Sequence, residues 1–309
     1  MGIVVIYARF RYSAECAFIK IIGLKTEKRD DEMNDIYEKI VFYKNQGIDA
    51  VLVTAVEKTG EGPVEIGKKM LVSEYDEAFG TVGGGALEHY AREKCKDLIK
   101  KRTHLTEKYL LDKGKVTPEA KTLPMVCGGT VTLFYEFLGV KGFVYIFGGG
   151  HVGQALVHVL KPLNFHVTVI DERKEIVERF VGGDVVIHSP FTQYIEQHPL
   201  KDQSYVIVCT PSHTHDYHVI NKVIEMKLAL KYIGMLCSIE KLKDYLNKTY
   251  EQFGKDVNLK NFYSPIGLDL GGGSPEEIAI SIVSEILAIS YNKKQKHMRE
   301  LIHDQDRYW

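Results

Sequence analysis

The sequence predicts an α/β protein in which an N-terminal mixed α+β domain precedes a Rossmann-like, doubly wound parallel sheet. Two observations lead to this prediction. A glycine fingerprint over 148–153 (Gly-x-Gly-x-x-Gly) lies between a buried apolar strand at 143–147 and a helix at 154–163, and a further strand at 166–170 ends on Asp171. This order, with an acid about 20 residues after the glycines, is the pattern that opens a Rossmann domain. The chain before residue 141 has a different, mixed pattern of strands and helices.

The mixed pattern defines the first domain. Its expected elements, in chain order, are a helix over 31–45 ended by Gly47, strands over 50–56 and 70–72, an apolar segment over 79–82, a helix over 86–101 and a strand over 131–138. Apolar residues recur at helical spacing in the helices and form short continuous runs in the strands. We place the boundary at 139–141, which gives domains 1–140 and 141–309, with 1–28 as a candidate extension.

The second domain continues with further apolar runs after the fingerprint. Runs at 184–187, 205–209 and 232–236 have the length and spacing of strands in a doubly wound parallel sheet. The stretch Ser274-Pro-Glu-Glu277 is a capping box with proline at the first helical position. The apolar stripe of the helix that follows comprises Ile278, Ile282, Ile286 and Leu287. We expect this stripe to pack in the core or against a second copy of the chain.

The fingerprint glycines predict a nucleotide site. In such a fold Gly148 makes the tight turn, Gly150 lets the backbone approach a pyrophosphate, and Gly153 allows close packing of helix and strand. The backbone at His151 and Val152 leads into the N-terminus of the helix, which supplies free N–H donors and a partial positive charge that suit phosphate.

The acid at the end of the second strand bears on the choice of nucleotide. Asp171 stands where a carboxylate accepts hydrogen bonds from ribose hydroxyls, which favours NAD or a related adenine nucleotide over NADP. Arg173 weakens that preference because a nearby arginine accommodates a ribose phosphate. The alternative interpretation is that Asp171 only caps the next helix.

Composition and charge exclude several classes of protein. With a formal net charge of −1 over 309 residues, the chain has no general attraction to nucleic acid. The apolar start is short and is followed by Arg9 and Arg11, so we expect neither a secretory signal nor a membrane span there. We therefore expect a cytoplasmic protein. The five cysteines form no C-x-x-C pair, which argues against a disulfide framework or a structural metal site.

Three further glycine clusters are together candidates for binding a second anionic ligand. Gly83, Gly84 and Gly85 precede a helix, Gly128 and Gly129 follow Cys127, and the cluster 271–273 precedes the capped helix. The two clusters that precede helices suit anions. Such runs indicate tight turns or close backbone approach to a ligand, and both interpretations stay open.

One cysteine and two polar residues are candidates for chemistry. The glycines after Cys127 leave its sulfur little shielded, so it is our candidate thiolate, although a free cysteine is often an inert core residue. Thr210 and His213 follow the strand at 205–209, where ligands of such sheets bind. His213 is a weaker candidate because it also fits a helix start. No metal ligands are assigned.

The ordered set of motifs resembles one family. The motifs are Gly60-Glu-Gly-Pro63 with Gly67-Lys-Lys-Met70, Gly80-Thr-Val-Gly-Gly-Gly-Ala-Leu-Glu88, Met125-Val-Cys-Gly-Gly129, Phe147-Gly-Gly-Gly-His151, Thr210 to Asp216, and Ser264-Pro-Ile-Gly267 leading to Gly271. From about residue 36 to 289 the chain is similar to the xanthine dehydrogenase accessory factor (XdhC/CoxI) family.

The resemblance implies a cofactor chaperone in place of an enzyme. Such a factor binds the molybdenum cofactor (molybdopterin) as cargo, supports its sulfuration and insertion, and acts on a molybdenum hydroxylase client with a sulfur-donating cysteine desulfurase. It also implies a homodimer. The chain departs from the family pattern at Val64, Ala86 and Cys237. Ala86 stands where many members have cysteine, which either shifts a thiolate role to Cys127 or makes that role unnecessary.

Two other functions stay open from the sequence. An NAD-dependent oxidoreductase acting on a small substrate would use the same nucleotide site, with His151 or His213 as the available acid–base groups. A nucleotide-sensing regulator would use the site without chemistry.

Overall fold

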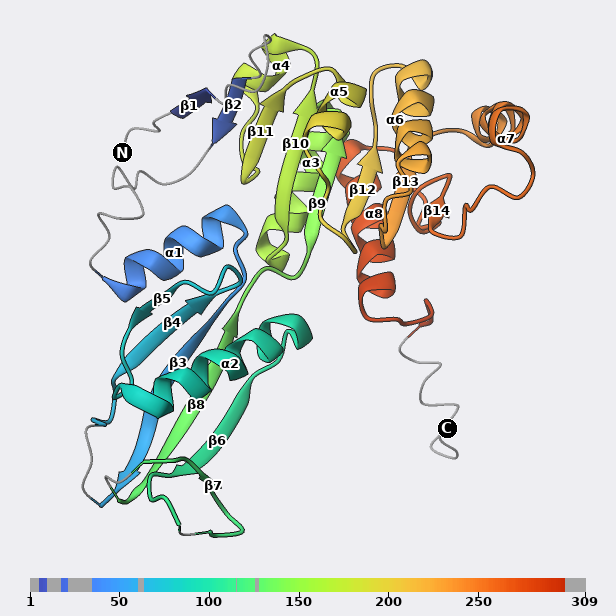
Figure 1. Ribbon diagram of the computed structural model, residues 1–309. Helices are drawn as coiled ribbons and strands as arrows, with labels where there is room; N and C mark the ends of the chain where they lie inside the picture. The colour runs from blue at the N-terminus through green and yellow to red at the C-terminus, as the bar shows by residue number, and fades with distance from the viewer. Residues whose placement is uncertain are drawn as a thin grey trace. The chain divides into compact units, whose positions relative to one another are not determined.

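A computed structural model of the chain describes residues 6–9, 18–21, 35–60, 64–114, 116–125 and 128–297. The chain divides into two compact units, one within Lys25–Val140 and one formed from parts of Met1–Leu24 and Lys141–Trp309. Each unit has its own sheet and is described by itself (Figure 1).

The C-terminal unit contains a doubly wound parallel sheet. Its parallel strands are β9 (Phe143–Phe147), β10 (His166–Asp171), β11 (Val185–His188), β12 (Tyr205–Val208), β13 (Tyr232–Met235) and β14 (Phe262–Tyr263). They are arranged in the order β11-β10-β9-β12-β13-β14, which is the Rossmann order 3-2-1-4-5-6 counted from β9. The predicted fold class is confirmed.

Two short strands extend this sheet at its β11 edge. β1 (Ile6–Arg9) and β2 (Phe18–Ile21) pair with each other, and β2 runs antiparallel to β11. The sequence-based division places them in the first domain, whereas their backbone pairing joins them to the second. An edge strand presents unpaired N–H and C=O groups, and a hairpin satisfies them irrespective of its place in the sequence.

Helices cover both faces of the parallel sheet. Alternate residues of β9 point to opposite faces: Val144 and Ile146 belong to one buried cluster, and Tyr145 and Phe147 to another. The first cluster is covered by α3 (His151–Leu160) and α8 (Pro275–Ser290), and the second by α5 (Phe191–Gln197), α6 (His213–Glu225) and α7 (Ile239–Phe253). Burial on both faces explains why the strands are continuous apolar runs.

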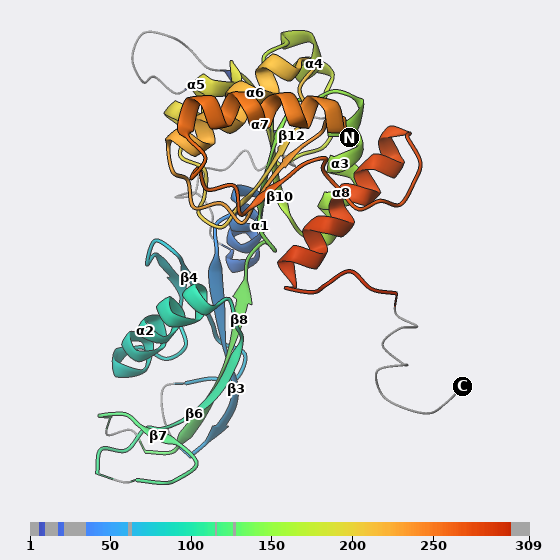
Figure 2. The ribbon, with the colours of Figure 1, turned by 90° about the vertical axis from the view of Figure 1, so that its right-hand side faces the viewer.

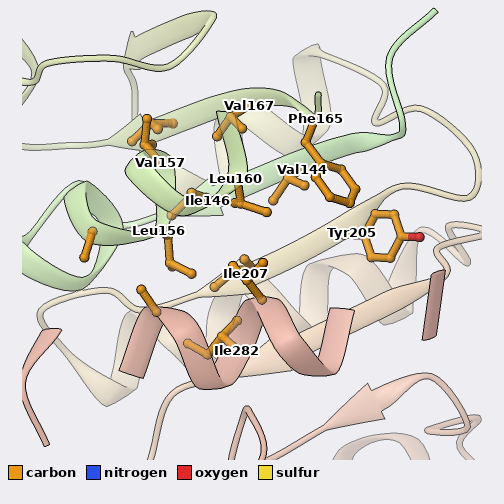
Figure 3. Close-up of a cluster of buried hydrophobic side chains, with 14 of the residues drawn as sticks. Val144, Ile146, Leu156, Val157, Leu160, Phe165, Val167, Tyr205, Ile207 and Ile282 are labelled. Carbon is orange, nitrogen blue, oxygen red and sulfur yellow. The ribbon is translucent and has the colours of Figure 1, made fainter. Parts of the chain in front are cut away.

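The capped helix α8 is part of the core. Ser274 and Glu277 form the predicted capping box, and Pro275 occupies the first turn. Ile282 and Ile286 are fully buried, and Ile278 and Leu287 pack partly against the same cluster. Figure 3 shows Ile282 facing Ile207 and Leu156 across this cluster. The stripe therefore packs in the core, one of its two predicted roles.

The fingerprint helix begins earlier than predicted. α3 starts at His151, with Gly150 as its N-cap, and a 3-10 turn (Lys161–Leu163) follows its end. Sequence reasoning delayed the start to Gln154 because Gly153 is a poor helix former. A short helix, α4 (Lys174–Arg179), follows β10.

The N-terminal unit is a mixed α+β domain (Figure 2). Its sheet has the order β5 (Ala78–Gly80), β4 (Lys69–Ser73), β3 (Ala50–Thr59), β8 (Thr130–Leu138), β6 (Leu105–Leu110) and β7 (Lys121–Thr122). Neighbouring strands are antiparallel except β6 and β7. α2 (Gly85–Lys101) packs on one face through Leu87, Ala91, Cys95 and Leu98.

The other helix of this unit, α1 (Ile36–Gln46), begins after Asp35, whose side chain accepts from the amide of Tyr37, and it ends at Gly47 in the left-handed conformation. Its Tyr43 packs with Ala50, Leu52 and Leu71 in a cluster separate from that of α2. Among the described residues no helix has the length and apolar character needed to cross a membrane.

Candidate functional site

The fingerprint turn is built by two glycines that have no room for a side chain. Gly148 has φ +118°, and a Cβ there would lie 2.3 Å from the carbonyl oxygen of Cys209. A Cβ on Gly153 would lie 2.1 Å from the carbonyl oxygen of Gly148. These contacts hold α3 against β9 and the end of β12, as the fingerprint predicts.

Gly150 has a different environment. A Cβ built there meets no atom within 4 Å, so no neighbouring atom of the protein requires a glycine at this position. The absent side chain leaves space for a ligand to approach the backbone. The amides of Gly150, His151 and Val152 have no hydrogen-bond partner among the described residues, and the first bond of the helix runs from Gln154 N to Gly150 O (2.8 Å). Free amides at a helix N-terminus suit a phosphate.

Asp171 is fully buried and binds groups of its own chain. Its Oδ1 accepts from the backbone N–H and Nε of Arg173 (both 2.9 Å), and its Oδ2 accepts from Arg173 Nη2 and from the amide of Gly149 (both 2.7 Å). Burial opposes ionisation, but these hydrogen bonds outweigh it, so the pKa of Asp171 lies below its usual value. The carboxylate is therefore charged and holds the glycine turn to the start of α4.

A pocket of about 280 Å³ lies between the glycine turn and α4. It is lined by Gly149, Gly150, His151, Gln154, Arg173, Ile176, Arg179 and Phe180. The lining includes two arginines and no carboxylate. Gln154 closes one side, because its side-chain amide exchanges hydrogen bonds with the backbone of Val181.

The predicted polar residues after β12 shape a loop. Thr210 Oγ1 lies 2.7 Å from Asp216 Oδ1 and 2.8 Å from Ser212 O, and Asp216 Oδ1 also accepts from the amide of Thr210 (3.0 Å). Burial is the largest influence on Asp216 and raises its pKa despite these bonds. His213 is exposed on the first turn of α6 and its ring contacts Tyr217 edge-on. Thr210 thus fixes the loop, and His213 faces solvent.

The cluster Gly83–Gly85 surrounds a carboxylate of its own helix. Glu88 Oε1 accepts from the amides of Val82 (3.1 Å) and Gly84 (2.8 Å) and from the hydroxyl of Thr81. Glu277 does the same at the third cluster, where its Oε2 accepts from the amides of Gly273 and Ser274 (both 3.0 Å). Both helix starts therefore carry an internal anion.

Two close contacts join glycine loops of the N-terminal unit to neighbouring segments. A Cβ on Gly60 would lie 2.9 Å from the Cα of Gly129, and a Cβ on Gly83 would lie 2.7 Å from Val64 Cγ2. Thr59 pairs with Thr130 in the sheet, and this pairing brings Gly60 close to Gly129. Gly128 and Gly129 have positive φ and pair with Leu111. Val64, one of the three residues that depart from the family pattern, is fully buried.

Cys127, our candidate thiolate, lies outside the described residues. The described cysteines are Cys95, Cys209 and Cys237. Burial raises the pKa of Cys95 and of Cys209 to about 12 and also raises the pKa of Cys237, so these thiols are protonated near neutral pH.

Sequence reasoning missed Gly149 and four side chains of the pocket, and one internal cap. Gln154, Ile176, Arg179 and Phe180 line the pocket. Arg179 and Phe180 lie more than one helical turn beyond Arg173, so their place depends on the phase of α4. Glu88 was visible as an acid in the first turn after the glycines, a position that favours capping.

Comparisons with known proteins match both units. Residues 144–286 match the family described as the XdhC Rossmann domain, and residues 44–109 match the XdhC and CoxI family. The chain is 29% identical over 160 residues to a protein of Bacillus subtilis named as a probable subunit of xanthine dehydrogenase, covering 51% of this chain. It is 25% identical over 262 residues to the protein YqeB of Escherichia coli, covering 84% of this chain.

These relatives are longer than this chain. The matched regions cover 47% of YqeB and 46% of the Bacillus subtilis protein, so the chain spans about half the length of the curated relatives it matches. A crystal structure described as a xanthine dehydrogenase from Bacillus halodurans is 20% identical, with a TM-score of 0.45, and the match covers 84% of this chain and 96% of that one.

Proposed function

The chain belongs to the XdhC/CoxI family, and from this premise we propose that it is an accessory factor in the maturation of a molybdenum hydroxylase of the xanthine dehydrogenase type. One observation supports this proposal most: the two family matches fall on the two compact units in order, 44–109 on the first and 144–286 on the second. The name of the Bacillus subtilis relative points to the same class of client enzyme.

We propose that the C-terminal unit binds an adenine nucleotide such as NAD. The open approach at Gly150, the free amides of His151 and Val152, and the adjoining pocket fit a nucleotide phosphate and its nucleoside. The Asp171–Arg173 pair holds the turn in this shape before any ligand arrives. Bound nucleotide would act as a structural or regulatory ligand of the factor.

We propose that the cargo is the molybdenum cofactor, carried during its sulfuration and insertion. The loop of Gly60 adjoins Gly129, and the loop of Gly83 adjoins Val64. These two contacts, and the position of Cys127 directly before Gly128 in the sequence, support a common surface for the cargo. The partners of this surface would be the client hydroxylase and a cysteine desulfurase, and the factor would act as a homodimer in the cytoplasm.

The proposal predicts a specific defect in a strain that lacks the protein. The client hydroxylase should accumulate in normal amount but with little activity, and its cofactor should be absent or in the desulfo form. The wild-type gene should restore activity, and Cys127→Ser should not. Normal hydroxylase activity in the deletion strain would refute the maturation role, whereas full rescue by Cys127→Ser would refute only the thiol.

A further inference from the structure

We infer that the pocket beside the fingerprint prefers an adenine nucleotide whose ribose bears a 2′-phosphate, as in NADP(H), over the unphosphorylated NAD(H). The inference rests on the proposed nucleotide site and names its ligand more closely. It reverses the preference that an acid at the end of the second strand suggests from sequence alone.

Asp171 has no acceptor left for a ribose diol. A carboxylate offers about four lone-pair positions, and Asp171 already accepts from two amides and from two nitrogens of Arg173. It is also fully buried. A diol would have to displace Arg173 from a bidentate ion pair, which would leave the guanidinium without its carboxylate. A phosphate group requires no such displacement.

The charged side chains in the pocket lining are both positive, which favours a ligand with an additional phosphate group. Arg173 uses Nε and Nη2 for Asp171, so other N–H donors of its guanidinium are left, and its side chain is 32% exposed beside the pocket. Arg179 lines the same pocket, is exposed, and forms no ion pair within the part of the chain that the structure describes. Two guanidinium groups suit a phosphomonoester, which carries a charge of about −1.5 to −2 at neutral pH.

Glu172 and Glu175 act electrostatically on Arg173, but neither of them lines the pocket. Glu172 Oε1 lies 3.0 Å from His215 Nδ1, and Glu178 pairs with Lys174 at 3.7 Å. Glu175 lies in the first turn of α4 and is exposed, but like the other two it does not line the pocket.

The pocket has an apolar wall and a volume that suit the nucleoside end of a dinucleotide. Ile176 and Phe180 stand against Gly149, where a Cβ would lie 3.0 Å and 3.2 Å from their side-chain carbons. They offer an apolar surface for a base. A volume of about 280 Å³ lies just below the usual range for ligand pockets, about 300–1,000 Å³, so the pocket fits one nucleoside end of a dinucleotide.

Calorimetric titration of the purified full chain tests the inference. NADPH should bind about 10- to 100-fold more tightly than NADH, the factor expected for one charge-assisted contact. Adenosine 2′,5′-bisphosphate should bind more tightly than AMP and than adenosine 3′,5′-bisphosphate. If NADH binds as tightly as NADPH or more tightly, or if the 3′,5′-bisphosphate binds more tightly than the 2′,5′-bisphosphate, the inference is wrong. The proposal of a nucleotide site would be unaffected by either result. If no nucleotide binds at millimolar concentration, both fail.

Variants assign the preference to this pocket. Arg179→Gln should reduce the ratio of NADPH affinity to NADH affinity about tenfold or more. The matched control Lys174→Gln removes a charge from the same helix outside the pocket and should leave the ratio of the two affinities unaltered. If the ratio is the same in Arg179→Gln as in the wild type, the assignment to this pocket is wrong. Arg179 is exposed, so its replacement does not threaten folding.

Discussion

Asp171 and Arg173 form a bidentate ion pair, with Nε–Oδ1 and Nη2–Oδ2 distances of 2.9 Å and 2.7 Å. The carboxylate is fully buried and the guanidinium is 32% exposed. Because Asp171 Oδ2 also accepts from the Gly149 amide, the pair connects the glycine turn to the start of α4. The acid that follows the fingerprint is thus a structural element of the turn in this chain.

Arg173→Met should destabilise the C-terminal unit by about 3 kcal/mol. The substitution leaves a buried carboxylate with only two amide donors, and the low end of the range for breaking a buried ion pair applies because Arg173 is partly exposed. Urea unfolding measures the loss. The double variant Asp171→Asn with Arg173→Met should recover part of it. A loss below about 1 kcal/mol in the single variant would show that the pair does not hold the turn.

The stability difference between wild type and Arg173→Met should depend on pH. The folded pKa of Asp171 is lowered, so its contribution is complete above the unfolded pKa of about 3.9 and is lost as pH falls through the folded value. The difference should therefore be constant from pH 6 to 8 and should narrow below about pH 4. Unfolding curves collected across this range check the sign, and a difference that widens in acid would contradict it.

Gly150→Ala and Gly153→Ala should have opposite effects. An alanine Cβ at position 153 meets the Gly148 carbonyl oxygen at 2.1 Å, and overpacking of this kind costs about 1 to 3 kcal/mol. At position 150 the Cβ meets nothing and φ is −70°, so stability should be unchanged or raised by up to about 1 kcal/mol. Nucleotide affinity should fall in Gly150→Ala. If Gly150→Ala binds the nucleotide as tightly as the wild type does, the pyrophosphate does not contact the backbone at this residue.

Glu88→Ala should destabilise the N-terminal unit by about 1 to 2 kcal/mol, because two amides and a hydroxyl lose their acceptor. The matched control is Glu93→Ala, an exposed acid of the same helix that pairs only with Lys96 among the described residues and should cost less than about 0.5 kcal/mol. Thermal and urea unfolding compare the two. Equal effects would mean that the glycine turn does not depend on Glu88.

Alkylation at pH 8 should distinguish the cysteines. Cys95, Cys209 and Cys237 have raised pKa values and should react slowly with iodoacetamide in the folded protein. Their rates should increase after unfolding in urea. Peptide mass spectrometry reads each site. If Cys127 is a low-pKa thiol, it should react well before these three, and slower reaction at Cys127 than at Cys237 would argue against a thiolate.

The parallel sheet was predictable because its strands are buried on both faces. β9 was predicted at its observed bounds, Phe143–Phe147, since every residue of the strand is apolar and glycines follow at once. β6 was missed because Glu107 and Lys108 interrupt its apolar pattern, and its pairing with β8 comes from the rest of the sheet.

The site was predictable as a backbone pattern and less so as side-chain chemistry. Glycine positions determine the turn, and the structure has the expected close contacts at Gly148 and Gly153. Sequence spacing does not show that Asp171 forms an ion pair with Arg173, because the pair depends on the Arg173 rotamer and on the burial of Asp171. The place of Arg179 in the pocket depends in turn on the phase of a six-residue helix.

Transfer of cofactor in vitro tests the proposed maturation role most directly. The purified chain is incubated under reducing, anaerobic conditions with molybdenum cofactor released from a molybdoenzyme, freed of unbound cofactor, and mixed with cofactor-free hydroxylase. The proposal predicts that the chain retains the pterin and that hydroxylase activity rises in proportion to the amount of loaded chain. Pterin retention no greater than that of serum albumin, with no rise in activity, would contradict it.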